Sequence, residues 1–567
     1  MLSNPTHHPS KTNIYYLYPL KISPFQYFMK YLPTILIIAL TILLSTVACK
    51  KETEPVDNIY RSNLTNPTLS ELEDFFDAGY DKIDGSVLIS LYTELSDLHL
   101  LSNVKTITGS LIINYNISLN SLKGLDNLQS IGGNVSINNN YRLYSIKGLT
   151  ELISVNGDLI INNNTMIDTI GGFSNLRSIG GNLEIYKNER LEIINDFNNL
   201  ESVNGKLEIC DNINFDSIGG FNNLLYVNDD VSIFDNDQLS TLNGFNFLKM
   251  IGGNFKVNNN DSLTYISGFT NLEHIVGDLD VYYITSLTDF SFLNNLKYIG
   301  GDLNIHGNIN LVNFNGLNSL KTIVGSLSVY RNHNLKYFEG LINLQSIGGT
   351  LYIHENELLV SLYGLSNLET VGSHLNIAYC ESLQNLHWLS SIKYIGGSLD
   401  LVNLHDDFEN FEGLNNLEYI GQDLDIWSLY NLSSFTGLDN LITIGDDFFL
   451  NKHDNLKNFD GLQKLKTIES LSITDCSSLE SMEGLSNLQF IGNRLYISSC
   501  DNLLTLDGLS NLQYIDGNYK VSYNYSLSDF CATRDLLITG EVVGDIIIKG
   551  NLFNPSVEDI IAGNCSQ

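Results

Sequence analysis

Apolar residues return along this chain at seven fixed places of a 24-residue unit. In the copy from Gly124 to Lys147 (GLDNLQSIGGNVSINNNYRLYSIK), numbered 1 to 24, they stand at places 2, 5, 8, 12, 14, 20 and 23. Places 12 and 14 alternate with polar neighbours, which is typical of a strand with one buried face. No copy has room for a helix of ten residues. Each copy is therefore predicted to form one coil of short strands and turns.

The glycine at place 1 keeps this 24-residue frame over about 400 residues, and Asp196, Phe292 and Trp388 replace it in the degenerate copies. One coil cannot bury its apolar side chains alone, but stacked coils bury them against each other at roughly 1.5–3 kcal/mol per side chain. The frame predicts an all-β parallel solenoid of about 19 coils over residues 83–528, roughly 90 Å long at the spacing of paired strands.

Place 17 carries a polar column inside this pattern. Stacked asparagines can hydrogen-bond to each other and to the backbone of turns, so we expect them to be structural. The place is filled by Asn116, Asn140, Asn164, Asn188, Asn212, Asn236, Asn260, Asn308, Asn332, Asn356 and Asn524, and by Cys380, Cys476 and Cys500. These cysteines are expected to be small buried residues rather than nucleophiles or metal ligands. Cys476 and Cys500 lie in adjacent coils, so a bridge between them stays open.

The run L-x-I-x-x-N-x-x-L-x-x-Φ-x-G-L-x-N-L-x-x-I-G-G over about residues 76–530 resembles the receptor L-domain repeats of the insulin and epidermal growth factor receptors. It is more similar still to bacterial surface lipoproteins with long arrays of such repeats, and it is related to leucine-rich repeats. The resemblance implies a right-handed parallel β-solenoid used for binding. It does not imply a particular ligand, and no ligand-contacting residue can be carried over.

Residues 1–48 contain a candidate export signal that starts at Met29. Lys30 is followed by an apolar run from Tyr31 to Val47 and by Ala48. A charged start, a short apolar core and a small residue before Cys49 resemble a bacterial lipoprotein signal, which implies cleavage before Cys49 and lipidation of its thiol. A plain transmembrane anchor is the alternative. We expect an exported protein attached to the outer membrane by its lipid alone, at the cell surface, with residues 49–67 as a flexible tether.

Both ends of the solenoid need caps, because the last coils would otherwise expose core and unpaired strands. Residues 68–82 are the candidate N-terminal cap, since Leu69–Phe76 has a helix-like pattern. Residues 529–567 are the candidate C-terminal cap, with a strand pattern in Val542–Lys549 and a short helix in Pro555–Ala562. In an exported protein, Cys531 and Cys565 are expected to form a disulfide that closes this cap.

The chain is strongly acidic, with 30 Lys and Arg against 64 Asp and Glu and a formal net charge of −34. This charge disfavours nucleic acid and anionic membrane surfaces as partners. No phosphate-binding glycine loop, zinc-type cysteine pair or nucleophile elbow is present, so no enzymatic activity, cofactor or metal is predicted. Place 11 holds an acidic column that could be a calcium ligand set or a solvated edge, made of Asp158, Asp230, Asp278, Asp302, Asp423 and Asp447.

Place 15 points outward from the predicted strand and is rich in aromatic residues. The candidate ligand-binding residues are Tyr186, Phe234, Tyr282, His306, Tyr330, His354 and Trp427, in a column that also contains Cys210, Asn258, Ala378 and Val402. An exposed stripe of rings with polar neighbours suits sugar stacking or an aromatic-rich protein contact. The alternative is that aromatic residues simply favour strands.

These observations predict a non-enzymatic surface lipoprotein whose solenoid binds an unknown protein or glycan. A carbohydrate-active β-helix enzyme and a passive cell-surface spacer are the alternatives.

Overall fold

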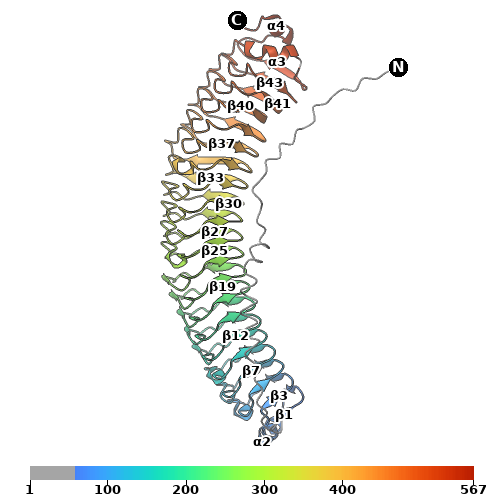
Figure 1. Cartoon of the computed structure of the whole chain (residues 1–567), viewed down its shortest axis with the longest axis vertical. Coiled ribbons are helices and arrows are strands. Elements are labelled where there is room, and N and C mark those ends of the chain that lie inside the picture. Colours follow the sequence, from blue (N-terminus) through green and yellow to red (C-terminus); the bar gives the residue numbers. More distant parts are fainter. Residues whose placement is uncertain (1–57, 540) are drawn as a thin grey trace, which may run out of the picture. The chain divides into compact units, whose positions relative to one another are not determined.

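The structure, a computed structural model, describes residues 58–539 and 541–567 (Figure 1). The predicted signal sequence, the predicted lipidation site Cys49 and the first part of the predicted tether lie outside the described residues. Asn58–Gln567 form one compact unit. Within the described residues, no helix combines the length and the apolar character that a membrane crossing requires.

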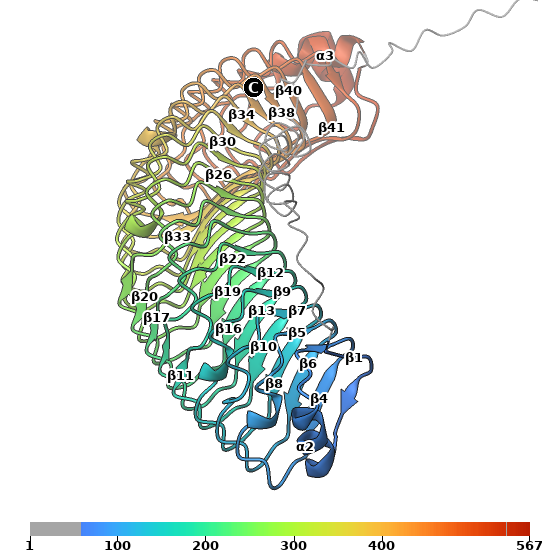
Figure 2. The same ribbon diagram turned by 60° about the horizontal axis from the view of Figure 1, so that its bottom comes forward.

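Each coil contributes one longer strand at places 12–15 to a parallel, in-register ladder, in which Leu159 for example pairs with Leu183. This front ladder lies on the concave side of the curved stack of coils (Figure 2). Its strands are β2 (Leu64–Thr65), β4 (Val87–Ser90), β6 (Leu111–Asn114), β8 (Val135–Asn138), β10 (Leu159–Asn162), β13 (Leu183–Tyr186), β16 (Leu207–Cys210), β19 (Val231–Phe234), β22 (Phe255–Asn258), β25 (Leu279–Tyr282), β27 (Leu303–His306), β29 (Leu327–Tyr330), β31 (Leu351–His354), β33 (Leu375–Cys380), β35 (Leu399–Leu404), β37 (Leu424–Trp427), β39 (Asp447–Asn451), β40 (Thr467–Thr474), β41 (Phe490–Ser498), β43 (Tyr519–Ser522) and β44 (Ile546–Lys549).

A second ladder of two-residue strands at places 7 and 8 precedes each longer strand and merges with it in β40 and β41. Its members are β1 (Ile59–Tyr60), β3 (Lys82–Ile83), β5 (Thr106–Ile107), β7 (Ser130–Ile131), β9 (Ser154–Val155), β12 (Ser178–Ile179), β15 (Ser202–Val203), β18 (Tyr226–Val227), β21 (Met250–Ile251), β24 (His274–Ile275), β26 (Tyr298–Ile299), β28 (Thr322–Ile323), β30 (Ser346–Ile347), β32 (Thr370–Val371), β34 (Tyr394–Ile395), β36 (Tyr419–Ile420), β38 (Thr443–Ile444) and β42 (Tyr514–Ile515).

A short sheet lies on the convex side, where its labels mark the outer edge of the stack in Figure 2. Its five strands are β11 (Thr169–Ile170), β14 (Ile193–Ile194), β17 (Ser217–Ile218), β20 (Thr241–Leu242) and β23 (Tyr265–Ile266). In these coils place 2 is phenylalanine, and the rings from Phe173 to Phe269 stack at centroid distances of 4.8–5.0 Å. This ring column replaces the smaller leucines of the other coils beneath the convex side.

The core follows the predicted alternation. In β8, Val135 and Ile137 are fully buried while Ser136 and Asn138 are partly exposed. The same pattern repeats from coil to coil and joins into one continuous hydrophobic core. The predicted parallel β-solenoid with a spacing of about 24 residues is therefore confirmed.

The place-1 glycine closes a turn that only glycine fits well. Gly316 has φ 109°, and a Cβ there would collide with the carbonyl of Phe290. Where Phe292 and Trp388 take this place, the turn changes into the 3-10 helices η3 (Ser291–Leu293) and η4 (His387–Leu389). Similar turns form η1 (His99–Leu101) and η2 (Lys147–Leu149).

The solenoid begins earlier than the sequence pattern predicts. Residues 58–67 were expected to belong to the tether, but β1 pairs with β3 and β2 pairs with β4, so they form the first coil. Helix α2 (Leu69–Asp77) then covers this end, with a capping box between Thr68 and Glu71. The first coil was missed because it lacks the place-1 glycine and carries only two-residue strands.

The other end is closed by η5 (Cys531–Thr533), α3 (Arg534–Thr539) and α4 (Val557–Ala562). Strand β44 adds one further coil by pairing with β43. Cys531 and Cys565 form the predicted disulfide, and α4 is flanked by the N-cap residue Ser556 and the C-cap residue Gly563. Since Asn58–Gln567 contain the whole described core and both caps, this unit has what it needs to fold without the preceding residues.

Candidate ligand-binding face

The place-15 side chains project from the front ladder on the concave side. Three of the predicted residues come together as a stack of rings from successive coils. Tyr282 and His306 have ring centroids 4.4 Å apart at 12°, and His306 and Tyr330 have centroids 4.5 Å apart at 7°. In-register pairing of β25, β27 and β29 sets this spacing, because it places each ring one strand separation from the next.

Neighbouring places extend the stack into a larger group. The Tyr352 ring at place 13 makes an edge contact with Tyr330 at 6.2 Å and stacks on His354 at 5.4 Å. His354 in turn makes an edge contact with Tyr379 at 4.9 Å. We call the following set the aromatic cluster: Tyr282, Tyr283, His306, Tyr330, Tyr352, His354 and Tyr379.

The sequence led us to expect a stripe of rings along the whole place-15 column. In the structure the rings contact one another over only part of it. Tyr186 and Phe234 lie outside the cluster, because Cys210 and Asn258, which are 5% and 7% exposed, separate their coils from it. Trp427 also lies apart and packs on Phe449 at 5.2 Å. Ring contacts need aromatic residues in successive coils, a condition that the full column does not meet.

The rings of the stack also do not present a flat surface. Because Tyr282 and Tyr330 cover the two faces of His306, that ring offers only its edges to a ligand. The column therefore presents edges and hydroxyl groups on the concave side. The faces on which a sugar could stack must come from another place in the repeat.

Place 16 supplies such a face. This place has positive φ in coil after coil, and Tyr283 takes it with φ 54°. The Tyr283 ring is perpendicular to Tyr282 and His306, at 90° and 87°, and lies across Gly307, where a Cβ would meet ring atoms Cδ1 and Cε1 at 2.6 Å. Tyr283 is 46% exposed. Sequence reasoning missed this residue. A visible indication was the glycine at place 16 in the coil that follows Tyr283, an arrangement that recurs at Gly550 after Tyr523.

Charged groups continue the place-16 column beyond this ring. The Arg331 guanidinium donates from Nε to Glu355 Oε2 at 2.6 Å, and both side chains are exposed. The hydrogen bond from Arg331 lowers the pKa of Glu355, so the pair stays ionised at neutral pH. Its charges compensate each other at the centre of the cluster.

The buried parts of the cluster are uncharged at neutral pH. Burial lowers the pKa of His306, with Arg331 adding to the shift, and burial raises the pKa of Tyr282 and Tyr330. His306 is therefore a neutral imidazole, and its Nδ1 is buried with no hydrogen-bond partner among the described protein groups. The cluster combines the neutral rings of Tyr282, His306 and Tyr330 with the exposed Arg331–Glu355 ion pair.

The acidic column at place 11 has a structural role that neither sequence alternative foresaw. Asp278 Oδ1 accepts a hydrogen bond from the Asp302 backbone N–H at 2.7 Å, and Asp302 Oδ1 accepts one from Ser326 at 2.6 Å. Asparagine, serine and histidine do the same at this place in other coils. Among the described residues, no three His, Cys, Asp or Glu side chains are grouped so that they could hold a metal ion.

The place-17 asparagines form a buried ladder beneath the face. Asn212 Nδ2 donates to the carbonyls of Ile185 and Cys210, and its Oδ1 accepts from the Asn188 backbone and side chain, at 2.9–3.4 Å. The other asparagines of the column are equally buried. Asn212 Nδ2 also lies 3.3 Å from Asn236 Oδ1 of the next coil, so this asparagine ties three coils together.

The cysteines of the same place are buried free thiols, and no disulfide joins Cys476 to Cys500. Burial raises the pKa of Cys380 to about 12, which disfavours the reactive thiolate. These positions fill space in the core.

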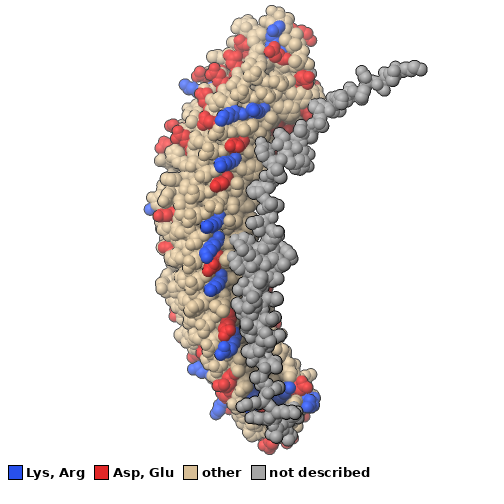
Figure 3. Space-filling view, in the orientation of Figure 1, with Lys and Arg blue, Asp and Glu red and all other residues tan. Residues whose placement is uncertain are grey.

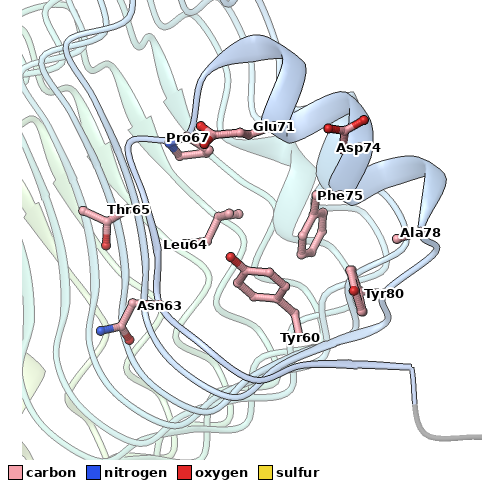
Figure 4. A pocket seen from close by; sticks show the side chains of 10 residues that line it. All are labelled: Tyr60, Asn63, Leu64, Thr65, Pro67, Glu71, Asp74, Phe75, Ala78 and Tyr80. Atoms are coloured by element: carbon pink, nitrogen blue, oxygen red, sulfur yellow. The ribbon is translucent and has the colours of Figure 1, made fainter.

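A separate cavity of about 370 Å³ lies beneath α2 and is lined by Tyr60, Leu64, Phe75 and Tyr80 among others (Figure 4). The three rings contact one another at 5.2–5.4 Å, so they pack the N-terminal cap rather than surround an open cage. Elsewhere on the surface, basic and acidic side chains alternate in a row along the solenoid (Figure 3). Ion pairs between successive coils include Arg177 with Glu201 and Lys297 with Glu273.

Comparison with known families matches two parts of the solenoid. The Receptor L domain model matches residues 81–152 and 249–315, and the BspA type Leucine rich repeat region model matches six copies over residues 403–527. The chain carries leucine-rich-repeat-like repeats. No curated protein matches it by sequence. The crystal structure of the TLR13–ssRNA13 complex is similar at 15% identity, over 84% of this chain and 82% of that chain, with a TM-score of 0.21. A solenoid of such repeats is consistent with ligand recognition, because stacked repeats create extended concave surfaces.

Proposed function

We propose that this protein is a non-enzymatic, lipid-anchored protein of the bacterial cell surface that binds a protein or glycan ligand through the aromatic cluster. The observation that carries the proposal is the gathering of seven rings on the concave side, in coils whose other places keep the repeat pattern. Aromatic residues are enriched where surfaces recognise partners, because they offer contact area at low entropic cost. A passive spacer would have no use for such a cluster.

A fragment that begins at Lys50 can be tested on arrays of glycans and of extracellular protein domains. The informative variant is Tyr282→Ala/Tyr330→Ala, which removes two rings of the stack. The matched control is Tyr186→Ala/Phe234→Ala, which removes two rings at the same place of the repeat outside the cluster. We expect the first variant to lose binding to the probes that the parent recognises and the control to keep it. Absence of any bound probe, or equal loss in both variants, contradicts the proposal.

The anchor is proposed on the resemblance of Thr46 to Cys49 to a lipoprotein signal. Cells that express the full chain can be fed an alkyne-tagged fatty acid, which labels lipidated proteins. Cys49→Ser should abolish the label, whereas Cys210→Ser, which replaces a buried cysteine of the solenoid, should keep it. Protease added to intact cells should then degrade the parent protein. Label on Cys49→Ser, or full protection of the parent from protease, contradicts the anchor or the surface location respectively.

Nucleic acid is not proposed as the ligand. A formal net charge of −34 opposes binding to phosphate backbones, which depends on basic side chains. The ssRNA of the TLR13–ssRNA13 complex belongs with TLR13 and is not transferred to this chain.

A further inference from the structure

The Tyr283 ring has one covered face and one open face. Both faces of His306 are occupied by Tyr282 and Tyr330, so the perpendicular contact between His306 and Tyr283 directs an edge of His306 toward the Tyr283 ring. Gly307 follows His306 in the same coil and brings its backbone against the ring. With the side toward this coil covered and the residue 46% exposed, the opposite face of Tyr283 is turned to solvent.

Polar and aromatic groups follow this ring along the axis of the solenoid. Place 16 continues with Arg331, Glu355 and Tyr379, and Tyr379 is again 46% exposed. Tyr283 and Tyr379 are four coils apart, which is about 19 Å at the spacing of paired strands. The site is therefore elongated, with a ring at each end and an exposed guanidinium–carboxylate pair between them.

The surroundings are acidic, which restricts the charge of a ligand. Asp278, Asp280 and Asp302 lie in the same coils as Tyr283 and its neighbours, and Asp278 and Asp302 add to the raised pKa that burial gives Asp280. Arg331 is compensated by Glu355. An anionic ligand would meet net repulsion here, whereas a neutral ligand would not.

We propose that this face binds a neutral oligosaccharide along the solenoid axis, with the apolar face of one pyranose ring on Tyr283 and hydroxyl groups on the Arg331–Glu355 pair. A sugar ring has C–H groups on its face and hydroxyls at its rim, which fits an exposed aromatic face beside a donor and an acceptor. A protein anchor instead needs a pocket that removes it from water, and these rings lie open on the surface. This inference rests on the proposed function, since it names the ligand class of the same face.

The test measures binding of cellohexaose, laminarihexaose and chitohexaose to the fragment from Lys50 by titration calorimetry, with polygalacturonate oligomers as the anionic comparison. Tyr283→Ala removes the ring, and Gly307→Ala displaces it by placing a Cβ against Cδ1 and Cε1. Alanine is tolerated at Gly307, because many other residues hold the same positive φ at this place. The matched control is Tyr115→Ala, a place-16 tyrosine with φ 55° and 47% exposure that makes no ring contact in the described part of the chain.

We expect at least one neutral hexasaccharide to bind, with the dissociation constant raised about tenfold by Tyr283→Ala and by Gly307→Ala and by less than about twofold by Tyr115→Ala. Polygalacturonate should not bind. Binding that survives both cluster variants, or a preference for the anionic probe, overturns the inference. If no neutral sugar binds while a protein on the array binds through the cluster, the sugar inference is wrong and the proposed function stands. If no probe of either kind binds, both are wrong.

Discussion

Places 15 and 17 lie two residues apart in each coil, yet they have opposite roles. Place 17 is buried and is asparagine in most coils, and these asparagines satisfy backbone groups of adjacent coils. Place 15 is half-buried, changes from coil to coil and gathers rings only where β25, β27, β29 and β31 lie side by side. The contrast teaches that the buried column holds the stack together, whereas the variable column is free to recognise a ligand.

The buried column itself shows a second contrast. Where asparagine fills place 17, the longer strand ends at place 15. Beyond that point the asparagine side chain, rather than a paired strand, makes hydrogen bonds to the backbone. Where Cys380 fills it, β33 runs on to Cys380 and pairs with Leu404 of β35. In this coil backbone pairing replaces the amide of asparagine. The strands of the Cys476 and Cys500 coils instead end at place 15, as the asparagine coils do.

The largest loss of stability is expected for an asparagine in the centre of the ladder. Asn212→Ala removes a buried hydrogen-bond donor from the carbonyls of Ile185 and Cys210 and removes the acceptor of the Asn188 backbone N–H. We expect the free energy of unfolding to fall by about 4 kcal/mol, measured by urea denaturation. The control Cys380→Ala, which removes one sulfur atom from a strand-paired coil, should cost about 1 kcal/mol. Similar costs for both would remove the distinction between the two kinds of coil.

The second largest loss of stability is expected at the C-terminal end of the asparagine ladder. The Asn524 backbone N–H donates to Asn551 Oδ1 beneath the C-terminal cap, which the disulfide between Cys531 and Cys565 closes. The two cysteines are 34 residues apart, so Cys531→Ser/Cys565→Ser should lower the free energy of unfolding by about 3 kcal/mol. Hydrogen exchange should show the loss first in β43 and β44. Uniform loss over the whole solenoid would contradict the role of this bond as a local cap.

The ionised carboxylate of Asp425, on the concave side, should destabilise the folded protein. Burial, together with Asp400, Asp423 and Asp447, raises the pKa of Asp425 to about 6. The folded state therefore binds more protons than the unfolded state between about pH 4 and pH 6, and stability falls as pH rises through that window. Asp425→Asn should raise the free energy of unfolding at pH 7 by about 1–2 kcal/mol, after allowance for solvent screening, and change nothing at pH 4.

Thermal unfolding of both proteins across this pH range measures the effect, with the exposed Asp501→Asn as control. A variant that gains as much stability at pH 4 as at pH 7 would show that the charge is not the cause.

The smallest effect on stability is expected at place 16. Tyr283 is half exposed, so Tyr283→Ala should change the free energy of unfolding by no more than about 1 kcal/mol while it weakens ligand binding about tenfold. Differential scanning fluorimetry beside calorimetry separates the two effects. A large loss of stability would place Tyr283 with the structural column and weaken the contrast.

The repeat could be predicted from the sequence because the core and turn places keep one kind of residue in most coils. Apolar residues at places 12 and 14 gave the front ladder, and the glycine at place 1 gave the turn. The first coil, which carries Ile59 and Leu64, escaped notice because it has no such glycine.

The site could be predicted only in part. Tyr282, His306, Tyr330 and His354 lie in the cluster, but a column of residue types does not reveal that stacked rings cover each other's faces. Tyr283 was not predicted as a site residue, because the residues at place 16 share a backbone conformation rather than a residue type. The structural role of the place-11 side chains was not predicted for a related reason, since Asp, Asn, Ser and His have in common only an acceptor atom.

The most direct test compares two variants of one coil, His306→Ala at place 15 and Asn308→Ala at place 17. Asn308 donates to the Val281 carbonyl and accepts from the Ile284 backbone N–H, whereas His306 contributes ring contacts. Array binding and urea denaturation are measured on both proteins at a temperature where both are folded. We expect His306→Ala to abolish ligand binding and to lower the free energy of unfolding by about 1 kcal/mol. Asn308→Ala should keep ligand binding and lower the free energy of unfolding by about 3 kcal/mol. The reverse result, with binding lost at Asn308 and kept at His306, would contradict the division between a structural and a recognising column.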